Sequence, residues 1–314
     1  MLLSTQRPST EIDLQKAREK EAALKTRLGG LGSALVAFSG GVDSTYLLAT
    51  AADVLGEQVA AATSRSETYS AAELEESQRI AEQFGVKQFV LRTSELEIDN
   101  FANNPVNRCY YCKKELFQTL GKLAREHGYA HVLYGANADD AYDHRPGHMA
   151  ADEIGAIGPL MEVGLTKAEI RELSRLRGLP TWDKPALACL ASRFPYHQQI
   201  TVEKLRMVGE AEAFLRTLGI RQVRVRHHDD RIARIEVEPK DVPRLASPET
   251  AEAVVRKLKR IGYVYVALDL EGFRSGSMNE PLGPRGEDAE TSGERAAADP
   301  KRPSEEGPSR RGDS

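Results

Sequence analysis

The sequence lacks the features of a membrane or secreted protein. Its apolar runs all fall short of the roughly 20 residues that span a bilayer. Its N-terminus has no charged segment followed by an apolar one, as a signal peptide would. It has three cysteines, an odd number that argues against a disulfide framework. We therefore expect a cytoplasmic protein whose cysteines serve a metal or a catalytic role.

The chain also lacks an excess of basic charge. Its 43 Lys and Arg residues are outnumbered by 47 Asp and Glu residues, which gives a net charge of −4 and a pI near 6.1. This balance argues against a dominant face for nucleic acid. The 314 residues, 40% of them hydrophobic, are enough for two modest domains with real cores.

A phosphate-binding loop is predicted at residues 39–44, where the sequence is Ser-Gly-Gly-Val-Asp-Ser. It joins an apolar strand pattern at residues 34–38 to a helical pattern at residues 45–55. Its glycines permit close backbone approach, and the helix N-terminus supplies N–H groups and partial positive charge, so an anion is expected there. The loop has no lysine and is not a Walker A loop; a glycine-rich turn is the simpler alternative. The candidate phosphate ligands are the backbone of Gly40 and Gly41 and the hydroxyl groups of Ser39 and Ser44, and Asp43 lies among them in the loop.

Strand and helix patterns alternate as far as residue 135. Further strands are predicted at residues 58–63, 88–92 and 131–135, and the helices between them at residues 70–83 and 115–127. This β-α-β-α-β order implies a parallel sheet with right-handed crossovers. Ligand-binding loops should therefore gather at the carboxyl ends of the strands.

Acidic residues follow the last of these strands. Asp139 and Asp140 come just past its end, and Arg145 follows shortly after. If these residues face the phosphate loop, the carboxylates are well placed to hold Mg²⁺, directly or through water. An acidic surface turn would explain the same residues.

A smaller α+β domain is predicted after residue 194, in the order α-β-β-α-β. Its helices are expected at residues 201–218 and 248–260, and its strands at residues 222–228, 232–238 and 263–270. The tail has almost no large apolar residues and should be disordered. The predicted division is a loose N-terminus (1–9), a nucleotide-binding domain (10–194), the α+β domain (195–276) and the tail (277–314).

Charged residues alternate along two strands of this second domain. The period of two in residues 222–228 places Arg224 and Arg226 on one face, spaced for a single anion. Glu236 and Glu238 share a face of the next strand, so an acidic or metal site beside a phosphate clamp is predicted. A solvated, salt-bridged sheet face is the alternative.

Five segments occur together and in order. They are the phosphate loop, Cys-Tyr-Tyr-Cys-Lys at 109–113, the acidic segment at 135–147, Pro-Ala-Leu-Ala-Cys-Leu-Ala-Ser-Arg at 185–193, and the paired strands at 223–238. Together, over residues 12–275, they resemble the LarE family of ATP-dependent sulfur transferases within the PP-loop ATP pyrophosphatases. The resemblance implies a PP-loop α/β fold, a parallel sheet flanked by helices, with a smaller C-terminal α+β domain.

The resemblance also implies an activity. Such enzymes adenylate a carboxylate of pyridinium-3,5-biscarboxylic acid mononucleotide, release pyrophosphate and install sulfur to give the thiocarboxylate, in nickel-pincer nucleotide biosynthesis. The loop would bind pyrophosphate, Arg224 and Arg226 the substrate phosphate, and Cys189 would handle sulfur. A homo-oligomer and a sulfide or other sulfur donor are implied as well. The implied pocket residues are Ser192, Arg193, Glu212 and Glu236.

The resemblance leaves the role of the cysteines open. In the single-cysteine form of the family, the counterpart of Cys189 gives up its own sulfur and becomes dehydroalanine. The pair Cys109 and Cys112 resembles the other form, in which three thiolates hold a [4Fe-4S] cluster with an open fourth iron. Zinc, held by the cysteines with His127, His131 or water, is the alternative metal.

Two other functions fit part of the sequence. A cluster-dependent PP-loop tRNA thiolase would need an RNA-binding module or a strongly basic face, and the acidic balance counts against it. A regulatory protein that binds ATP without chemistry would not explain the cysteines or the anion ligands of the second domain. ATP consumption by the isolated protein separates an enzyme from such a regulator.

Overall fold

The structure is a computed structural model. It describes residues 12–66, 68, 71–98, 101–142, 146–185, 189–228, 231–274 and 276–282. The chain divides into one compact unit that ends at Met278 and a second that starts at Asn279. In the described part, no helix is both long and apolar enough to cross a membrane. The predicted loose N-terminus and most of the predicted tail lie outside the described residues.

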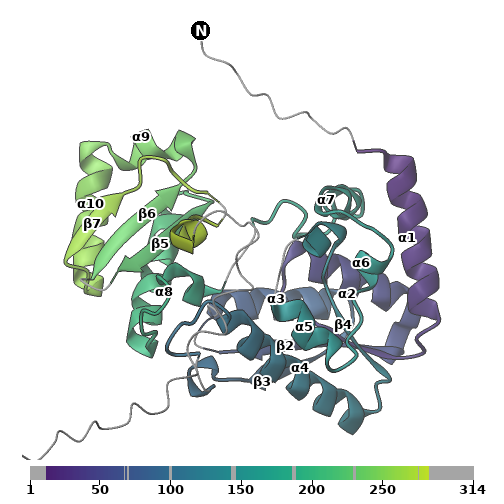
Figure 1. The fold of residues 1–314 in the computed structure, drawn as a ribbon. Helices are drawn as coiled ribbons and strands as arrows, with labels where there is room; N and C mark the ends of the chain where they lie inside the picture. Colours follow the sequence, from purple (N-terminus) through teal and green to yellow (C-terminus); the bar gives the residue numbers. More distant parts are fainter. Residues whose placement is uncertain are drawn as a thin grey trace, which may run out of the picture. The chain divides into compact units, whose positions relative to one another are not determined.

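A parallel sheet with strand order β3-β2-β1-β4 forms the nucleotide-binding part (Figure 1). Its strands are β1 (Ala34–Ala37), β2 (Val59–Arg65), β3 (Lys87–Arg92) and β4 (His131–Tyr134). The helices between them are α2 (Val42–Leu55), α3 (Ala71–Gln83) and α4 (Arg108–His127). The predicted β-α-β-α-β order and the α/β class are confirmed.

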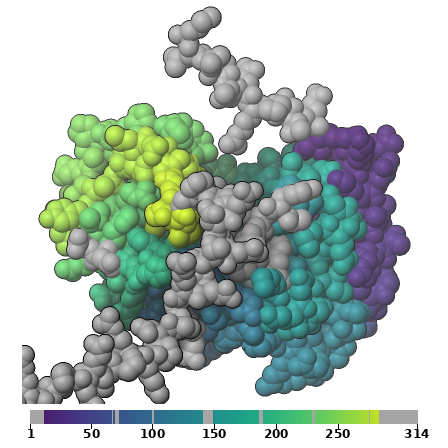
Figure 2. Space-filling view, in the orientation of Figure 1, coloured from purple at the N-terminus to yellow at the C-terminus, as the bar shows by residue number. Residues whose placement is uncertain are grey.

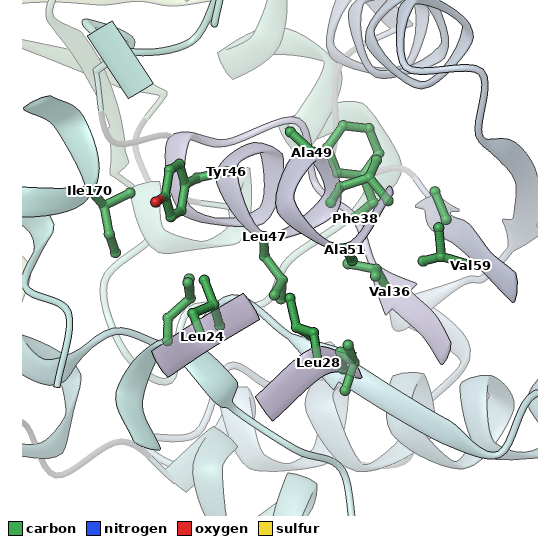
Figure 3. Close-up of a cluster of buried hydrophobic side chains, with 14 of the residues drawn as sticks. Leu24, Leu28, Val36, Phe38, Tyr46, Leu47, Ala49, Ala51, Val59 and Ile170 are labelled. Atoms are coloured by element: carbon green, nitrogen blue, oxygen red, sulfur yellow. The ribbon is translucent and has the colours of Figure 1, made fainter. Parts of the chain in front are cut away.

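Successive residues of β1 enter cores on opposite faces of the sheet, as the period of two requires. Val36 packs with α1 (Leu14–Gly29), α2 and α7 (Lys167–Leu176), whereas Leu35 packs with α4. Figure 3 shows side chains from α1, α2 and α7 meeting in the first of these cores. The labelled side chains of α1 and α7 there are Leu24, Leu28 and Ile170.

Helix α1 carries its charge on the outside. Its buried residues are Ala17, Leu24 and Leu28, and its Lys and Glu side chains are mostly exposed or half-buried. The helix lies at the surface in Figure 2, where it is purple. A helix with so many Lys and Glu residues is stable in this position because its charged side chains stay in contact with water.

Helix α4 begins earlier than predicted. The sequence pattern placed its start at residue 115, but the helix runs from Arg108. Residues 108–120 contain no glycine or proline, so nothing stops the helix from extending toward its N-terminal end. Cys109 and Cys112 therefore lie in the first turns of a helix, three residues apart and on one face.

The second sheet is smaller and has the order β5-β6-β7. β5 pairs antiparallel with β6, and β6 pairs parallel with β7, which confirms the predicted α-β-β-α-β order. The main elements are α8 (Val202–Thr217), β5 (Val223–His228), β6 (Ile232–Val237), α10 (Pro248–Ile261) and β7 (Tyr265–Leu268). Short helices that the pattern missed are α5 (Pro146–Asp152), α6 (Pro159–Glu162) and α9 (Val242–Leu245).

The two predicted boundaries of the second domain lie at residues 194 and 277. The division predicted after residue 194 falls inside the first compact unit. Phe194 belongs to one hydrophobic cluster with Phe101, Ile200 and Leu205, which come from both sides of that position in the sequence. The tail was predicted to begin at residue 277, close to the start of the second compact unit at Asn279. Ser277–Leu282 form a short 3-10 helix, η6, and Ser277 is buried.

The end of β4 lies almost in contact with the start of α2. A Cβ atom added at Gly135 would stand 2.9 Å from the backbone nitrogen of Ser44 and 3.1 Å from its Cα. Real Cβ atoms do not approach backbone so closely, so this position requires glycine. The contact sets the separation between the phosphate loop and the residues that follow β4.

We predict that Gly135→Ala lowers the free energy of unfolding by about 1–3 kcal/mol, because the methyl group pushes the helix away from the strand. Urea unfolding followed by circular dichroism measures the change. Gly121→Ala is the matched control: its nearest contact would be Arg125 Nη1 at 3.5 Å, within helix α4. Alanine there should raise stability by about 0.5–1 kcal/mol. Equal stability of Gly135→Ala and the wild type would contradict the contact.

Candidate active site

The phosphate loop is shaped by its own hydroxyl groups. The Oγ atoms of Ser39 and Ser44 lie 3.1 Å apart, and Ser44 Oγ donates to the carbonyl of Gly41 at 3.2 Å. Gly40 has φ 67°, a left-handed conformation that favours glycine. Among the described residues, no side chain caps α2 at Gly41. The start of this helix is therefore suited to an anion.

The acidic residues after β4 face this loop. Asp139 and Asp140 lie in η3 (Ala138–Tyr142), where the N–H of Asn137 donates to Asp140 Oδ2 at 3.0 Å. Burial raises the pKa of Asp43, the charge of Lys167 opposes that shift, and the nearby carboxylate of Asp140 adds to it. The structure thus brings the loop and the acidic segment together. Arg145, predicted for the same site, lies outside the described residues.

Lys167 connects the loop to the acidic segment, and sequence reasoning missed it. It is the first residue of α7, and its Nζ donates to Asp43 Oδ2. Its backbone N–H donates to Asp139 Oδ2 at 2.8 Å. The capping box of Thr166 and Glu169 was the available signal, because it identifies the residue that begins the helix.

Lys184 is a second lysine that sequence reasoning missed. Its Nζ donates to the carbonyl of Gly40 at 2.9 Å and to Glu76 at 2.7 Å. Arg171 holds the segment that carries it, donating to the carbonyl of Lys184 at 2.7 Å. The two lysines place cationic groups beside a loop that has none of its own.

Asp43 offers an oxygen suited to a cation. Its Oδ1 atom is buried and has no hydrogen-bond partner among the residues that the structure describes. A buried carboxylate oxygen left in this state needs a partner. Carboxylate oxygens, which Asp43 and the nearby Asp140 both supply, are ligands that Mg²⁺ prefers. The residues present therefore fit a magnesium ion.

Two of the three cysteines pack against the same apolar cluster. Cys112 and Cys189 are partly buried and pack against it, whereas Cys109 is exposed. Burial raises the pKa of the Cys112 thiol to about 12 and also raises the pKa of Cys189. A nearby metal would favour the thiolate form instead. The cluster consists of Phe101, Ala191, Phe194, Ile200, Leu205 and Val208.

Cysteine sulfur atoms are suitable ligands for a soft metal ion. The predicted group of metal-binding side chains, however, is not brought together in the described residues. Within the described ranges, no three His, Cys, Asp or Glu side chains are close enough together to hold a metal ion. The iron–sulfur cluster therefore stays a prediction. His127 is wrong as a zinc ligand: it ends α4, about 22 Å along the helix from Cys112.

Glu95 is a buried carboxylate near the cysteines that sequence reasoning did not identify. It begins the 3-10 helix η2 (Glu95–Glu97) and is 4% exposed. In the described part of the chain its Oε2 atom has no hydrogen-bond partner. Its negative charge raises the pKa of both Cys112 and Cys189, in addition to the larger effect of burial. No sequence pattern marks a buried glutamate within a polar loop.

Arg193 and Glu212 form a buried ion pair. Arg193 Nε donates to Glu212 Oε1 at 2.7 Å, and its Nη2 donates to Oε2 at 3.0 Å. Glu212 also accepts from Arg216 and from the N–H of Val225. Burial alone would raise the pKa of Glu212, but these arginines lower it overall. Glu212 therefore anchors arginines in this site.

Arg226 and Glu236 form a second buried pair. Arg226 Nη2 donates to Glu236 Oε2 at 2.6 Å and to Ser277 Oγ at 3.0 Å, and its Nη1 donates to the carbonyl of Ser192 at 3.1 Å. Ser277 Oγ donates to Glu236 Oε1 at 2.9 Å, and Arg234 lies 3.1 Å from the same oxygen. Within the described residues, Arg226 Nε is buried without a partner.

Arg224 is buried on the same face of β5 as Arg226. Its guanidinium lies over the ring of Phe273, 5.3 Å from the centroid. Burial, aided by the charge of Arg193, lowers the pKa of Arg224 to about 10. The structure thus joins all six residues predicted for the phosphate clamp and pocket in one network. They are Ser192, Arg193, Glu212, Arg224, Arg226 and Glu236.

A strand–loop–helix anion site with acidic residues at the end of the neighbouring strand defines a PP-loop nucleotide-binding domain. Residues 20–143 match the family model described as asparagine synthase. The chain is 39% identical to the pyridinium-3,5-bisthiocarboxylic acid mononucleotide synthase of Lactiplantibacillus plantarum, over 84% of this chain and 95% of that protein. This protein belongs to the LarE family.

Two uncharacterized proteins are also similar. One, from Synechocystis sp., is 46% identical over 82% of this chain and 96% of its own length. The other, from Methanocaldococcus jannaschii, is 31% identical over 60% of this chain and 73% of its own length.

Proposed function

We propose that this enzyme is an ATP-dependent sulfurtransferase that acts on pyridinium-3,5-biscarboxylic acid mononucleotide. It adenylates a carboxylate of this substrate, releases pyrophosphate and installs sulfur to give the thiocarboxylate. One observation carries the proposal: a match to a bisthiocarboxylate synthase over 84% of this chain, which has both a loop suited to phosphate and a buried arginine network. In cells it would contribute to the nickel-pincer nucleotide cofactor.

The phosphate loop supports the adenylation step. Ser39, Gly40, Gly41, Asp43 and Ser44 would hold the β- and γ-phosphates, leaving the α-phosphate open to a carboxylate nucleophile. Mg²⁺ on Asp43 and Asp140, with Asp139 in support, would neutralise charge that develops on the departing pyrophosphate. Arg145 is proposed for the adenylate side on the resemblance alone.

The arginine network supports binding of the substrate phosphate. In the described part of the chain, its arginines outnumber its carboxylates by two, so a phosphate dianion would balance the charge. Arg226 Nε supplies a buried donor with no other partner there. The arginines are Arg193, Arg216, Arg224, Arg226, Arg234 and Arg274, and the carboxylates are Glu212, Glu236, Asp269 and Glu271.

The cysteines support the sulfur step. Cys112 and Cys189 meet at one apolar cluster, and Arg193 donates to the carbonyl of Cys189 at 3.2 Å, which connects the sulfur site to the arginine network. We propose that Cys109, Cys112 and Cys189 hold a [4Fe-4S] cluster. When bound, it would carry the sulfur delivered to the activated carboxylate. The role of the chain is to exclude water and bring these groups near the substrate.

We predict that the protein cleaves ATP to AMP and pyrophosphate when the carboxylated nucleotide is present. Chromatography of the nucleotide products tests this. Gly41→Val should abolish the reaction, since even a Cβ there would stand 3.4 Å from Ser39 Oγ and a larger side chain blocks close approach of phosphate. ADP and phosphate as products would refute the assignment.

A second prediction concerns Arg226. Replacement by alanine should weaken substrate binding roughly 10- to 100-fold, as expected for a lost charge-assisted phosphate contact, and leave ATP affinity unchanged. Calorimetric titration with each ligand measures both. Arg206→Ala, which removes an exposed pair with Glu210, is the control. Normal substrate binding combined with loss of ATP binding would show that the clamp is misassigned.

A third prediction separates the two sulfur mechanisms. If Cys109, Cys112 and Cys189 share a cluster, each alanine variant should lose both iron and sulfur transfer, because each removes one of three protein ligands. Adenylation should survive, since the phosphate loop is a separate part of the sheet. Iron and sulfide analysis and product yield measure this.

The competing mechanism gives a different pattern. If Cys189 is sacrificed, Cys109→Ala and Cys112→Ala should each make about one product per chain, the limit set by a consumed nucleophile. Mass spectrometry would then find dehydroalanine at position 189 in these variants. That result with normal single-turnover yield would overturn the cluster.

A further inference from the structure

The ammonium group of Lys167 contacts Asp43, the loop carboxylate best suited to a metal. Lys167 Nζ donates to Asp43 Oδ2, and Asp43 Oδ1 has no hydrogen-bond partner within the described residues. The Asp43 side chain is 18% exposed and that of Lys167 is 36% exposed. The lysine thus covers a largely buried carboxylate from the solvent side.

The backbone of Lys167 is fixed by hydrogen bonds, whereas within the described residues its side chain is held only by its contact with Asp43. Its N–H donates to Asp139 Oδ2 at 2.8 Å, and the preceding Leu165 accepts from the N–H of Ala138 at 2.8 Å. The capping box at Thr166 holds the same turn. The ammonium group stands on a flexible four-carbon stem, so it can change partners without movement of the helix.

Binding of magnesium and ATP would change the charges around Lys167. A divalent cation bound to Asp43 would neutralise its carboxylate and repel the ammonium group of Lys167. A triphosphate bound at the loop would in turn attract a positively charged side chain. The loop itself has no lysine. A lysine that leaves the carboxylate for a phosphate oxygen would relieve that repulsion and supply the positive charge in one step.

We infer that Lys167 competes with the divalent cation for Asp43 and moves to the phosphates when cation and nucleotide bind together. Lys167 is then a nucleotide ligand in the bound state and a substitute for the metal in the free state. The inference rests on the proposed function, because it assumes that the loop binds ATP with a divalent cation. Binding of the cation and binding of the nucleotide would then be cooperative. The cation displaces Lys167 from Asp43 and frees it for the phosphates, and the nucleotide draws Lys167 away and frees Asp43 for the cation.

Lys167→Met tests the inference, because it keeps the length of the stem and removes the charge. The probes are Mn²⁺ alone, followed by electron paramagnetic resonance, and α,β-methylene-ATP with saturating Mn²⁺, followed by calorimetry. We expect Lys167→Met to bind Mn²⁺ roughly 10- to 100-fold more tightly than the wild type and the nucleotide weaker by a similar factor, as for one charge-assisted contact. A residue that only supports the fold would not move the two affinities in opposite directions.

Two controls isolate the effect. Lys20→Met removes a 2.7 Å ion pair between Lys20 of α1 and Glu169, which lies in α7 as Lys167 does. This variant should match the wild type in both titrations. Lys184→Met should weaken the nucleotide but leave Mn²⁺ binding unchanged, because Lys184 contacts Gly40 and Glu76 rather than Asp43. If Lys167→Met fails to fold, Lys167→Arg keeps the charge and should bind Mn²⁺ no more tightly than the wild type.

The outcomes are distinct. The inference is overturned if Lys167→Met binds Mn²⁺ no more tightly than the wild type, or if it binds the nucleotide with unchanged affinity. It is also overturned if Lys167→Arg binds Mn²⁺ more tightly than the wild type. In each of these cases the wild type still binds the nucleotide, and the proposed function stands. A wild-type protein that does not bind α,β-methylene-ATP at all would refute the proposed function itself.

Discussion

A strand end can approach a neighbouring helix as closely as β4 approaches α2 only where it carries no side chain. That condition is met at Gly135, and it brings two loops from distant parts of the sequence to one edge of the sheet. The phosphate loop follows β1, and the acidic segment follows β4, which pairs with it. The carboxylates of Asp43 and Asp140 interact because the strands are neighbours, and Lys167 and Lys184 then reach the loop from the segment that follows.

The parts of the site that could be predicted are those that a local pattern determines. Ser-Gly-Gly between a strand and a helix specifies a loop conformation, and the period of two in β5 places Arg224 and Arg226 together. The capping box of Thr166 and Glu169 is likewise a local signal, and it marks the start of α7. In each case neighbouring residues decide the structure, so the sequence alone was sufficient.

The parts that were missed depend on tertiary packing. The contact of Lys167 with Asp43 joins residues 124 positions apart, and no local pattern predicts it. Glu95 looks like an ordinary polar residue until packing buries it. Ser277 stands in a segment of tail-like composition, yet its hydroxyl lies between Arg226 and Glu236. The start of α4 was misplaced because cysteine and tyrosine are indifferent helix formers.

The segment that carries Lys184 also ends at the sulfur site. Lys184 contacts the phosphate loop, and Cys189 stands five positions later. Five extended residues span at most about 18 Å, so the backbone itself limits how far the loop and this sulfur can separate. An acyl adenylate hydrolyses in water, and a short tether limits the path over which it would be exposed. The covalent chain would therefore keep the proposed adenylation and sulfur-transfer steps within one small volume.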